Sequence, residues 1–267
     1  GASPIVPCGI AVCAGVAYSV QMSISTGKLS LNQLWKDVQA LVAARGSDLL
    51  LPAAAFIFLP NLAQGLFVAQ PANPAQPDPE YSLTAIVVGL IGLAATLSII
   101  AMVFDRRMET GAALRLAFAR YGRALAAAII TGLIVFVGLL ALIVPGLYLL
   151  SRLWLVMPAV TMGDGDGEGL LGPLKASWRA TQGQALRSFG IFLIVVFGSL
   201  LLAVVAAAAA LLDPLIGSGD MNAGRLGLFG ALAAAVVSSI IGIYFAVTQA
   251  RAYQMLTGRA DPDAPRV

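Results

Sequence analysis

One arginine of this chain lies well inside an apolar stretch and is the residue best placed to do chemistry. Arg152 follows Gly146 by six residues, which is about 9 Å along a helix. Charged side chains inside a membrane often line the path of a substrate or an ion. No Asp or Glu lies in any apolar stretch to pair with this arginine. Arg152 therefore either contacts an anion within the protein or extends its guanidinium toward the membrane surface.

Four other residues that could contact a lipid headgroup lie in polar segments beside apolar stretches. Tryptophan prefers the membrane interface, and each basic residue near an anionic membrane adds about 1 kcal/mol of attraction. The sequence thus predicts a lipid-headgroup site formed by Arg152, Trp35, Trp178, Arg179 and Arg123. The alternative is that these segments only anchor and orient the protein, and the two interpretations are compatible.

The chain lacks residues that catalytic sites, metal sites and ion-coupled transporters commonly use. The chain has no histidine, which excludes His bases, His metal ligands and Ser-His triads. Its two cysteines, Cys8 and Cys13, have no further Cys or His with which to bind zinc or an iron–sulfur cluster. The missing intramembrane carboxylates also argue against a proton- or sodium-coupled transporter. We therefore expect no catalysis, no cofactor and no metal.

The acidic run at residues 164–169 briefly resembles a calcium-binding loop. That pattern needs a bidentate glutamate at its twelfth position, where this chain has Lys175. The run is predicted to be a flexible acidic turn instead.

The elements that position these residues are expected to be membrane helices. The chain is 59% hydrophobic and 11% charged, against about 25% charged residues in soluble domains. Apolar runs of about 20 residues can cross a hydrocarbon core roughly 30 Å thick. They predict six spans, at residues 49–67, 83–104, 125–144, 147–162, 189–212 and 226–253. Pro145-Gly146 is predicted to form the tight turn between the third and fourth spans.

Basic residues are distributed unevenly over the segments that join the spans. Fourteen of the 16 Lys and Arg residues fall on one side of the six-span pattern, and the opposite loops 70–82 and 213–225 contain only Arg225. The positive-inside rule then places both termini in the cytoplasm. Because the net charge of +3 comes from these flanks, it indicates a membrane surface rather than nucleic acid.

An amphipathic stretch precedes each outward-going span. The apolar stripe of the first is predicted to consist of Leu31, Leu34, Trp35, Val38, Leu41 and Val42. The second and third copies share a spacing, since Leu114-x-x-x-Phe118 matches Leu174-x-x-x-Trp178. The apolar face of the second stretch is predicted to consist of Leu114, Phe118, Tyr121 and Leu125. We expect an all-α integral membrane protein of six transmembrane helices, built as three parallel units of an interfacial amphipathic helix and a helical hairpin.

The last span carries a stripe of small residues for helix packing. Small side chains recur at every fourth position, at Gly230, Ala234, Ser238, Gly242, Ala246 and Ala250. Such faces let helix backbones approach closely. The stripe is predicted to pack inside the bundle, and the alternative is a seam between two copies of the chain.

The chain is expected to have one main domain with two short flanks. Residues 1–21 are an apolar stretch that lacks the basic start of a signal peptide, and we interpret them as an extension or fusion remnant of unclear origin. Residues 22–259 are predicted to form a single six-span membrane domain. Residues 260–267 are predicted to be a polar C-terminal tail.

Two stretches resemble a bacterial family. Residues 144–160 contain Pro145-Gly146, Arg152 and Pro158, and residues 172–183 contain Ala-Ser-Trp178 and a final glycine. Together they resemble the membrane domain attached to some glycerophosphodiester phosphodiesterases and its stand-alone YciC-type relatives. The resemblance implies a stand-alone membrane protein rather than the enzyme, whose metal-binding acids and histidines do not occur in this chain.

These observations lead to one expected function and two alternatives. We expect a non-enzymatic protein of the bacterial inner membrane that binds anionic lipid or supports a membrane partner in envelope function. The alternatives are a permease or channel for a small solute or lipid, and an accessory subunit of a larger membrane complex. The expected partners are anionic membrane lipids and a membrane protein or second copy of the chain, with no nucleic acid.

Overall fold

The computed structural model describes residues 31–70, 78–211 and 226–259. Within these ranges every regular element is a helix, and six helical stretches are long and apolar enough to cross a membrane. This confirms the predicted all-helical class and the number of candidate spans. The predicted extension 1–21 and tail 260–267 lie outside the described residues.

The helices follow one another along the chain with short connections. In order they are α1 (Leu31–Ala53), the π-helix η1 (Ala54–Phe58), α2 (Leu59–Phe67), α3 (Pro79–Phe104), α4 (Thr110–Ala141), α5 (Ile143–Leu153), α6 (Val156–Met162), the 3-10 helix η2 (Asp166–Leu171), α7 (Gly172–Ala180), α8 (Ala185–Ala210) and α10 (Leu228–Thr257). The stretch from α1 to α2 is one candidate span, and α5 with α6 is another.

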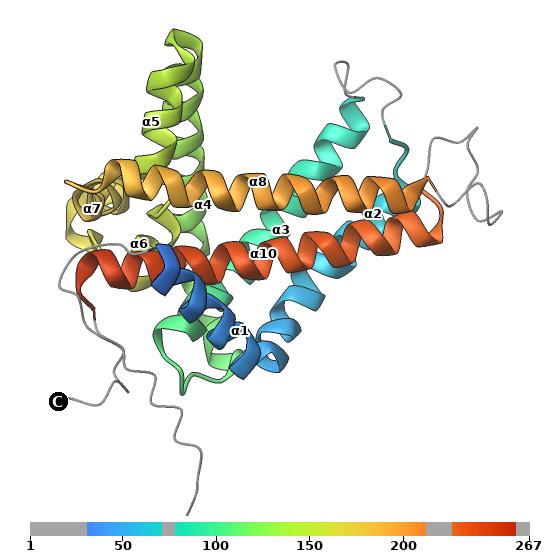
Figure 1. Ribbon diagram of the computed structural model, residues 1–267, viewed down its shortest axis with the longest axis horizontal. Coiled ribbons are helices and arrows are strands. Elements are labelled where there is room, and N and C mark those ends of the chain that lie inside the picture. Colours follow the sequence, from blue (N-terminus) through green and yellow to red (C-terminus); the bar gives the residue numbers. More distant parts are fainter. Residues whose placement is uncertain (1–30, 71–77, 212–225, 260–267) are drawn as a thin grey trace, which may run out of the picture.

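Three pairs of long helices extend from one region of the molecule. Figure 1 shows the α8–α10 pair lying crosswise to the α4–α5 pair, with α2 and α3 directed between them. The pairs meet where α1, α6 and α7 lie and where α10 ends. We call the polar part of this region the charged end, comprising residues 105–109, 163–184 and 254–259.

The second half of α10 is the centre of the core. Every side chain from Ala246 to Gln254 is buried, whereas a helix at the edge of a bundle exposes one face. α1, α3, α6 and α7 all contact α10. This part of α10 is therefore largely shielded from solvent.

The three predicted surface segments join their spans in three different ways. Of the predicted stripe, α1 buries Leu34, Val38 and Leu41, whereas Leu31 is 45% and Trp35 is 50% exposed. The helix bends at Arg45, where φ is −127° and ψ is 19°. The second segment and its span form the single helix α4. The third segment is α7, which a turn separates from α8. In that turn Gly183 has a φ of 75°, a conformation that glycine adopts without steric cost.

The buried face of α4 differs from the predicted one. Phe118 is 56% exposed, whereas Ala113, Ala117 and Ala124 are buried. α3 packs against α4, and small alanine side chains let two helix backbones approach closely. The side of α4 that packs inside the protein is thus lined by small side chains, and the predicted apolar face stays a prediction.

The turn between α4 and α5 comes earlier than predicted. Leu142 joins the two helices in an extended conformation, with φ −169° and ψ 146°, and Pro145 and Gly146 lie in the first turn of α5. Proline is tolerated there because first-turn N–H groups have no helical acceptor. A Cβ on Gly146 would lie 2.8 Å from the Cα of Leu139. This glycine therefore permits close packing of the hairpin rather than forming its turn.

The predicted small stripe of α10 is divided between two environments. Gly230, Ala246 and Ala250 are buried, and Ala234, Ser238 and Gly242 are half-buried. A Cβ on Gly242 would lie 2.6 Å from Cδ1 of Ile57 in η1. The packing role of the whole stripe stays a prediction.

Candidate functional site

Arg152 lies between two aromatic rings at the contact of α5 with α7. Its Cζ is 5.2 Å from the centre of the Tyr148 ring and 4.9 Å from that of Trp178. A cation in this position is attracted by the negative face of the ring. Its Nε and Nη2 donate to the Tyr148 hydroxyl at 3.1 and 2.7 Å, and Nη1 lies 3.4 Å from Oγ1 of Thr181. Rings and hydroxyls together hold the guanidinium in place.

Serine hydroxyls join the end of α5 to α7 and α8. Ser177 Oγ donates to the backbone carbonyl of Arg152 at 2.7 Å, and Ser188 Oγ donates to that of Ser151 at 3.1 Å. Trp154 Nε1 donates in turn to Ser188 Oγ at 2.7 Å. The last carbonyls of a helix have no helical donor, so these serines satisfy them. The backbone that carries Arg152 is thereby tied to both neighbouring helices.

The contacts of Arg152 are all with uncharged groups. None of the ion pairs among the described residues includes Arg152, and the residue is half-buried. Tyr148, Trp178 and Thr181 leave its positive charge unneutralised. An anion that reaches this position would meet a full charge in a partly dry site, where electrostatic attraction is stronger than in water.

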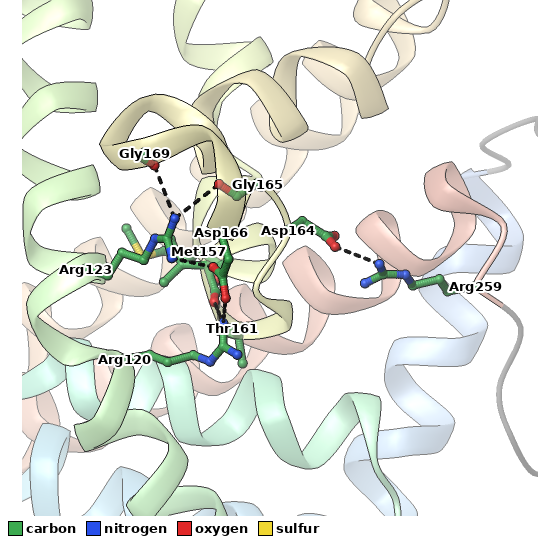
Figure 2. Close-up of polar contacts among 10 residues, drawn as sticks. Arg120, Arg123, Met157, Thr161, Asp164, Gly165, Asp166, Gly169 and Arg259 are labelled. Atoms are coloured by element: carbon green, nitrogen blue, oxygen red, sulfur yellow. Dashed lines mark hydrogen bonds and ion pairs between the residues drawn. The ribbon is translucent and has the colours of Figure 1, made fainter.

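The acidic run that was predicted to be a flexible turn is instead held by ion pairs. Asp166 lies 2.5 Å from Nη1 of Arg123 and 3.5 Å from Nη1 of Arg120, both on α4. Asp164 accepts a hydrogen bond from Nη2 of Arg259 at 2.7 Å. Figure 2 shows the loop with the two α4 arginines on one side and Arg259 on the other. The loop therefore joins α4 to the end of α10.

Glu168 extends the same network to α7. Its carboxylate lies 2.8 Å from Nη2 of Arg179 and 3.7 Å from Nζ of Lys175. The hydrogen bond from Arg179 is the main cause that holds the pKa of Glu168 below its ordinary value of 4.5. Among the described residues no group of three His, Cys, Asp or Glu could hold a metal ion. The acids of the loop serve as partners for nearby bases.

Glycines give the loop its shape, and arginines satisfy its backbone. Gly163, Gly165 and Gly169 have φ values of 76°, 80° and 73°, which side chains rarely allow. Arg123 Nη2 donates to the carbonyls of Gly165 and Gly169 at 3.1 and 3.2 Å. Arg120 Nη1 donates to the carbonyl of Val160 at 2.8 Å. The two arginines hold the loop through both carboxylate and backbone oxygens.

A buried ion pair near the end of α10 was not predicted. Arg251 Nη2 lies 3.1 Å from Oδ2 of Asp37 on α1, and the two side chains are 6% and 9% exposed. Arg251 Nη1 also donates to Oε1 of Gln254 at 2.9 Å. The sequence did offer one hint, because Arg251 is a charged residue near the end of an apolar span. It was counted instead with the basic residues that flank the spans. The pair fixes the amphipathic helix α1 against the central helix.

Trp35 lies in different surroundings from Arg152. Its ring stacks on Tyr244 of α10, with the ring centres 6.3 Å apart. Both residues line an apolar groove of about 260 Å³ between α1, α8 and α10. An acyl chain suits such a lining better than a charged headgroup does.

The structure brings together two of the five residues of the predicted headgroup site. Arg152 and Trp178 are in contact, Arg123 and Arg179 bind acids of the loop, and Trp35 lies at the groove. Their roles in binding stay predictions. Tyr148 was missed, although its spacing of four residues from Arg152 places both on one helix face. Thr181 gave no local signal, because only the fold brings it near α5.

Comparison of the chain with protein-family models, with curated proteins and with solved structures found no match. The resemblance to YciC-type membrane proteins stays a prediction that depends on residues 144–160 and 172–183. The function is therefore argued from the geometry of the site.

Proposed function

We propose that this chain is a non-enzymatic protein of a bacterial inner membrane and that it binds an anionic lipid at Arg152. The observation that supports the proposal is a half-buried guanidinium that contacts two aromatic rings and no acid. Bilayers that contain anionic lipids present phosphate and other negative groups at their surface. The planar guanidinium can bind two oxygens of a phosphate at once.

The geometry of Arg152 leaves one side of the guanidinium available. Nη1 is 3.4 Å from Oγ1 of Thr181 and 3.5 Å from the carbonyl of Trp178, both beyond the usual range of about 2.7–3.2 Å for a strong N–H···O bond. A phosphate oxygen would replace these weak contacts with a charge-assisted bond. Tyr148 keeps its shorter bond to Nη2, at 2.7 Å, and would hold the side chain during the exchange.

The first test is native mass spectrometry of the protein released from its own membrane in mild detergent. We expect a phosphatidylglycerol or another anionic phospholipid to remain bound at fixed stoichiometry. Arg152→Leu should lower the retained lipid by about tenfold or more, since a charge-assisted hydrogen bond contributes roughly 1.5–3 kcal/mol.

A charge-matched control separates a specific site from general attraction. Arg187 at the start of α8 is exposed and takes part in no ion pair of the described residues. Arg187→Leu removes the same charge and should leave lipid retention within about twofold. Equal losses in both variants, or no loss in Arg152→Leu, would contradict a binding site at Arg152. A protein that co-purifies in place of lipid would support the accessory-subunit alternative.

The proposal includes an orientation and a repeating build. The charged end would face the cytoplasm, in line with the positive-inside rule. Insertion of the three units in the same direction would require the α8–α10 pair, which lies crosswise to the α4–α5 pair in Figure 1, to turn alongside it. α1, the first half of α4 and α7 are the segments that would lie at the cytoplasmic surface.

Cysteine labelling tests the orientation. Cys8 and Cys13 are the chain's two cysteines, so replacing both by serine gives a background without thiols. Ala69 follows α2 and is exposed, and Gly167 is exposed in the acidic loop with nothing within 4 Å of an added Cβ. In intact spheroplasts a membrane-impermeant maleimide should label Ala69→Cys and should label Gly167→Cys only after permeabilisation. The reverse pattern would overturn the orientation.

A further inference from the structure

A second cavity lies among α2, α3 and α10, in the part of the molecule where Figure 1 shows these helices side by side. Its volume is about 530 Å³, within the range of about 300–1,000 Å³ that is usual for small-molecule sites. Its polar lining consists of Asn61, Gln64, Thr96 and Gln249, and no charged residue lines it. A cavity with three amides and a hydroxyl within candidate membrane spans requires an explanation, because polar groups there are costly.

Gln249 has a buried acceptor without a partner. Its side chain is 3% exposed, and its Nε2 donates to the backbone carbonyl of Trp154 at 2.7 Å. A carbonyl only accepts hydrogen bonds, so the NH₂ group of the amide must face Trp154. Oε1 is left with no hydrogen-bond partner. Gln249 lines the cavity, and because Oε1 itself is buried, a donor in the cavity would reach this oxygen through a small shift of the amide.

The cavity is built by an irregular helix and a row of small residues. η1 is a π-helix, in which the N–H of Leu59 bonds to the carbonyl of Ala54, and such turns are frequent at functional sites. Asn61 Nδ2 donates to the carbonyl of Ile57 at the same place, at 2.8 Å. On α3 the cavity wall includes Gly89, and a Cβ there would have nothing within 4 Å. This glycine leaves the cavity open on the α3 side.

We propose that this cavity binds an uncharged molecule that has a hydroxyl group, and that the hydroxyl donates a hydrogen bond to Oε1 of Gln249. The ligand is uncharged because the lining offers no counter-charge, and an unpaired charge in such a site is strongly unfavourable. It has a donor because the free atom of Gln249 is an acceptor. The apolar part of the lining, which includes Val88 and Leu93, would contact carbon atoms of the ligand. This site does not depend on the lipid site at Arg152.

Two sources could supply a hydroxyl of this kind, and two probes distinguish them. Tritiated 1-octanol represents an alcohol dissolved in the membrane, and tritiated xylitol represents a small polyol from water. Binding is measured by scintillation proximity on purified protein in phosphatidylcholine nanodiscs, with empty nanodiscs as background. We expect saturable binding of one probe, and the probe that binds identifies the source. If octanol binds, methyl octyl ether should compete about tenfold more weakly than unlabelled octanol, because it has no donor for Gln249.

Two variants and one control test the location. Gln249→Leu removes the acceptor, and Gly89→Phe places a ring on the cavity wall formed by α3, a different helix from that of Gln249. Each should weaken binding about tenfold or more. Gly132→Phe places the same ring on an exposed position of α4, where a Cβ also has nothing within 4 Å, and should leave binding unchanged. Loss of binding in Gly89→Phe supports the site even if Gln249→Leu fails to fold.

The proposal is overturned if neither probe binds saturably, or if Gly89→Phe binds the probe as well as the wild type does. Arg152→Leu should leave binding of the probe unchanged, so failure at this cavity and failure at the lipid site are distinguishable.

Discussion

Replacing Arg251 by leucine is expected to destabilise the protein by about 3–5 kcal/mol, the usual cost of removing one partner of a buried ion pair. Arg251 and Asp37 are 6% and 9% exposed and lie 3.1 Å apart. Without the guanidinium, the Asp37 carboxylate would stay in the core between α1 and α10 with no counter-charge. Denaturant or thermal unfolding in one fixed detergent measures the effect.

The double variant is the control for this prediction. Asp37→Leu combined with Arg251→Leu removes both charges, and exchange of a whole buried pair for apolar residues is often neutral or stabilising. We therefore expect the double variant to regain most of the stability that Arg251→Leu loses. If it is as unstable as the single variant, the stability at this position comes from the other contacts of Arg251, including that with Gln254. The ion-pair explanation would then be wrong.

Gly172→Ala is expected to destabilise the charged end by about 3 kcal/mol, the upper part of the range for overpacking. A Cβ on Gly172 would overlap the backbone carbonyl of Gly165. Backbone atoms cannot move aside as the tip of a side chain can. The loop would have to shift, and the bond of Arg123 to the Gly165 carbonyl, now 3.1 Å long, would be lost with it.

The same loop offers a matched control for Gly172→Ala. Gly167 is also a glycine of the acidic loop, but an added Cβ there meets nothing within 4 Å. Gly167→Ala should therefore change the free energy of unfolding by less than about 0.5 kcal/mol, as is usual for surface substitutions. If the two variants unfold alike, the contact between Gly165 and Gly172 does not hold the loop in place.

The elements of the fold were largely predictable, and their faces were not. Of the stripe predicted on the first amphipathic segment, Leu34, Val38 and Leu41 are buried, whereas Leu31 and Trp35 are exposed. On α4 the predicted apolar face is not the face that packs inside the protein, since Phe118 is 56% exposed and Ala117 is buried. Periodicity shows that a helix has an apolar side, but the distance to the neighbouring helix decides which side chains fit.

The candidate site was predictable only in part for a similar reason. Arg152 is recognisable because a charge inside an apolar run is rare. Its ring partner Trp178 lies 26 residues further along the chain. The unpaired oxygen of Gln249 gives no local signal at all, since the carbonyl of Trp154 that binds the NH₂ group of the same amide is 95 residues away.

The amino-acid sequence by itself determined that this protein has six helical stretches long and apolar enough to cross a membrane. It also determined that no histidine is present for catalysis or metal binding. Transfer of a helix into a membrane depends mainly on a sum over its own residues, so local composition is sufficient. Only the tertiary structure decided which charges pair, as with Arg251 and Asp37, and which polar groups stay open, as with Gln249. Those outcomes depend on side chains that are distant in the chain, and a pairwise contact is not a property of either segment alone.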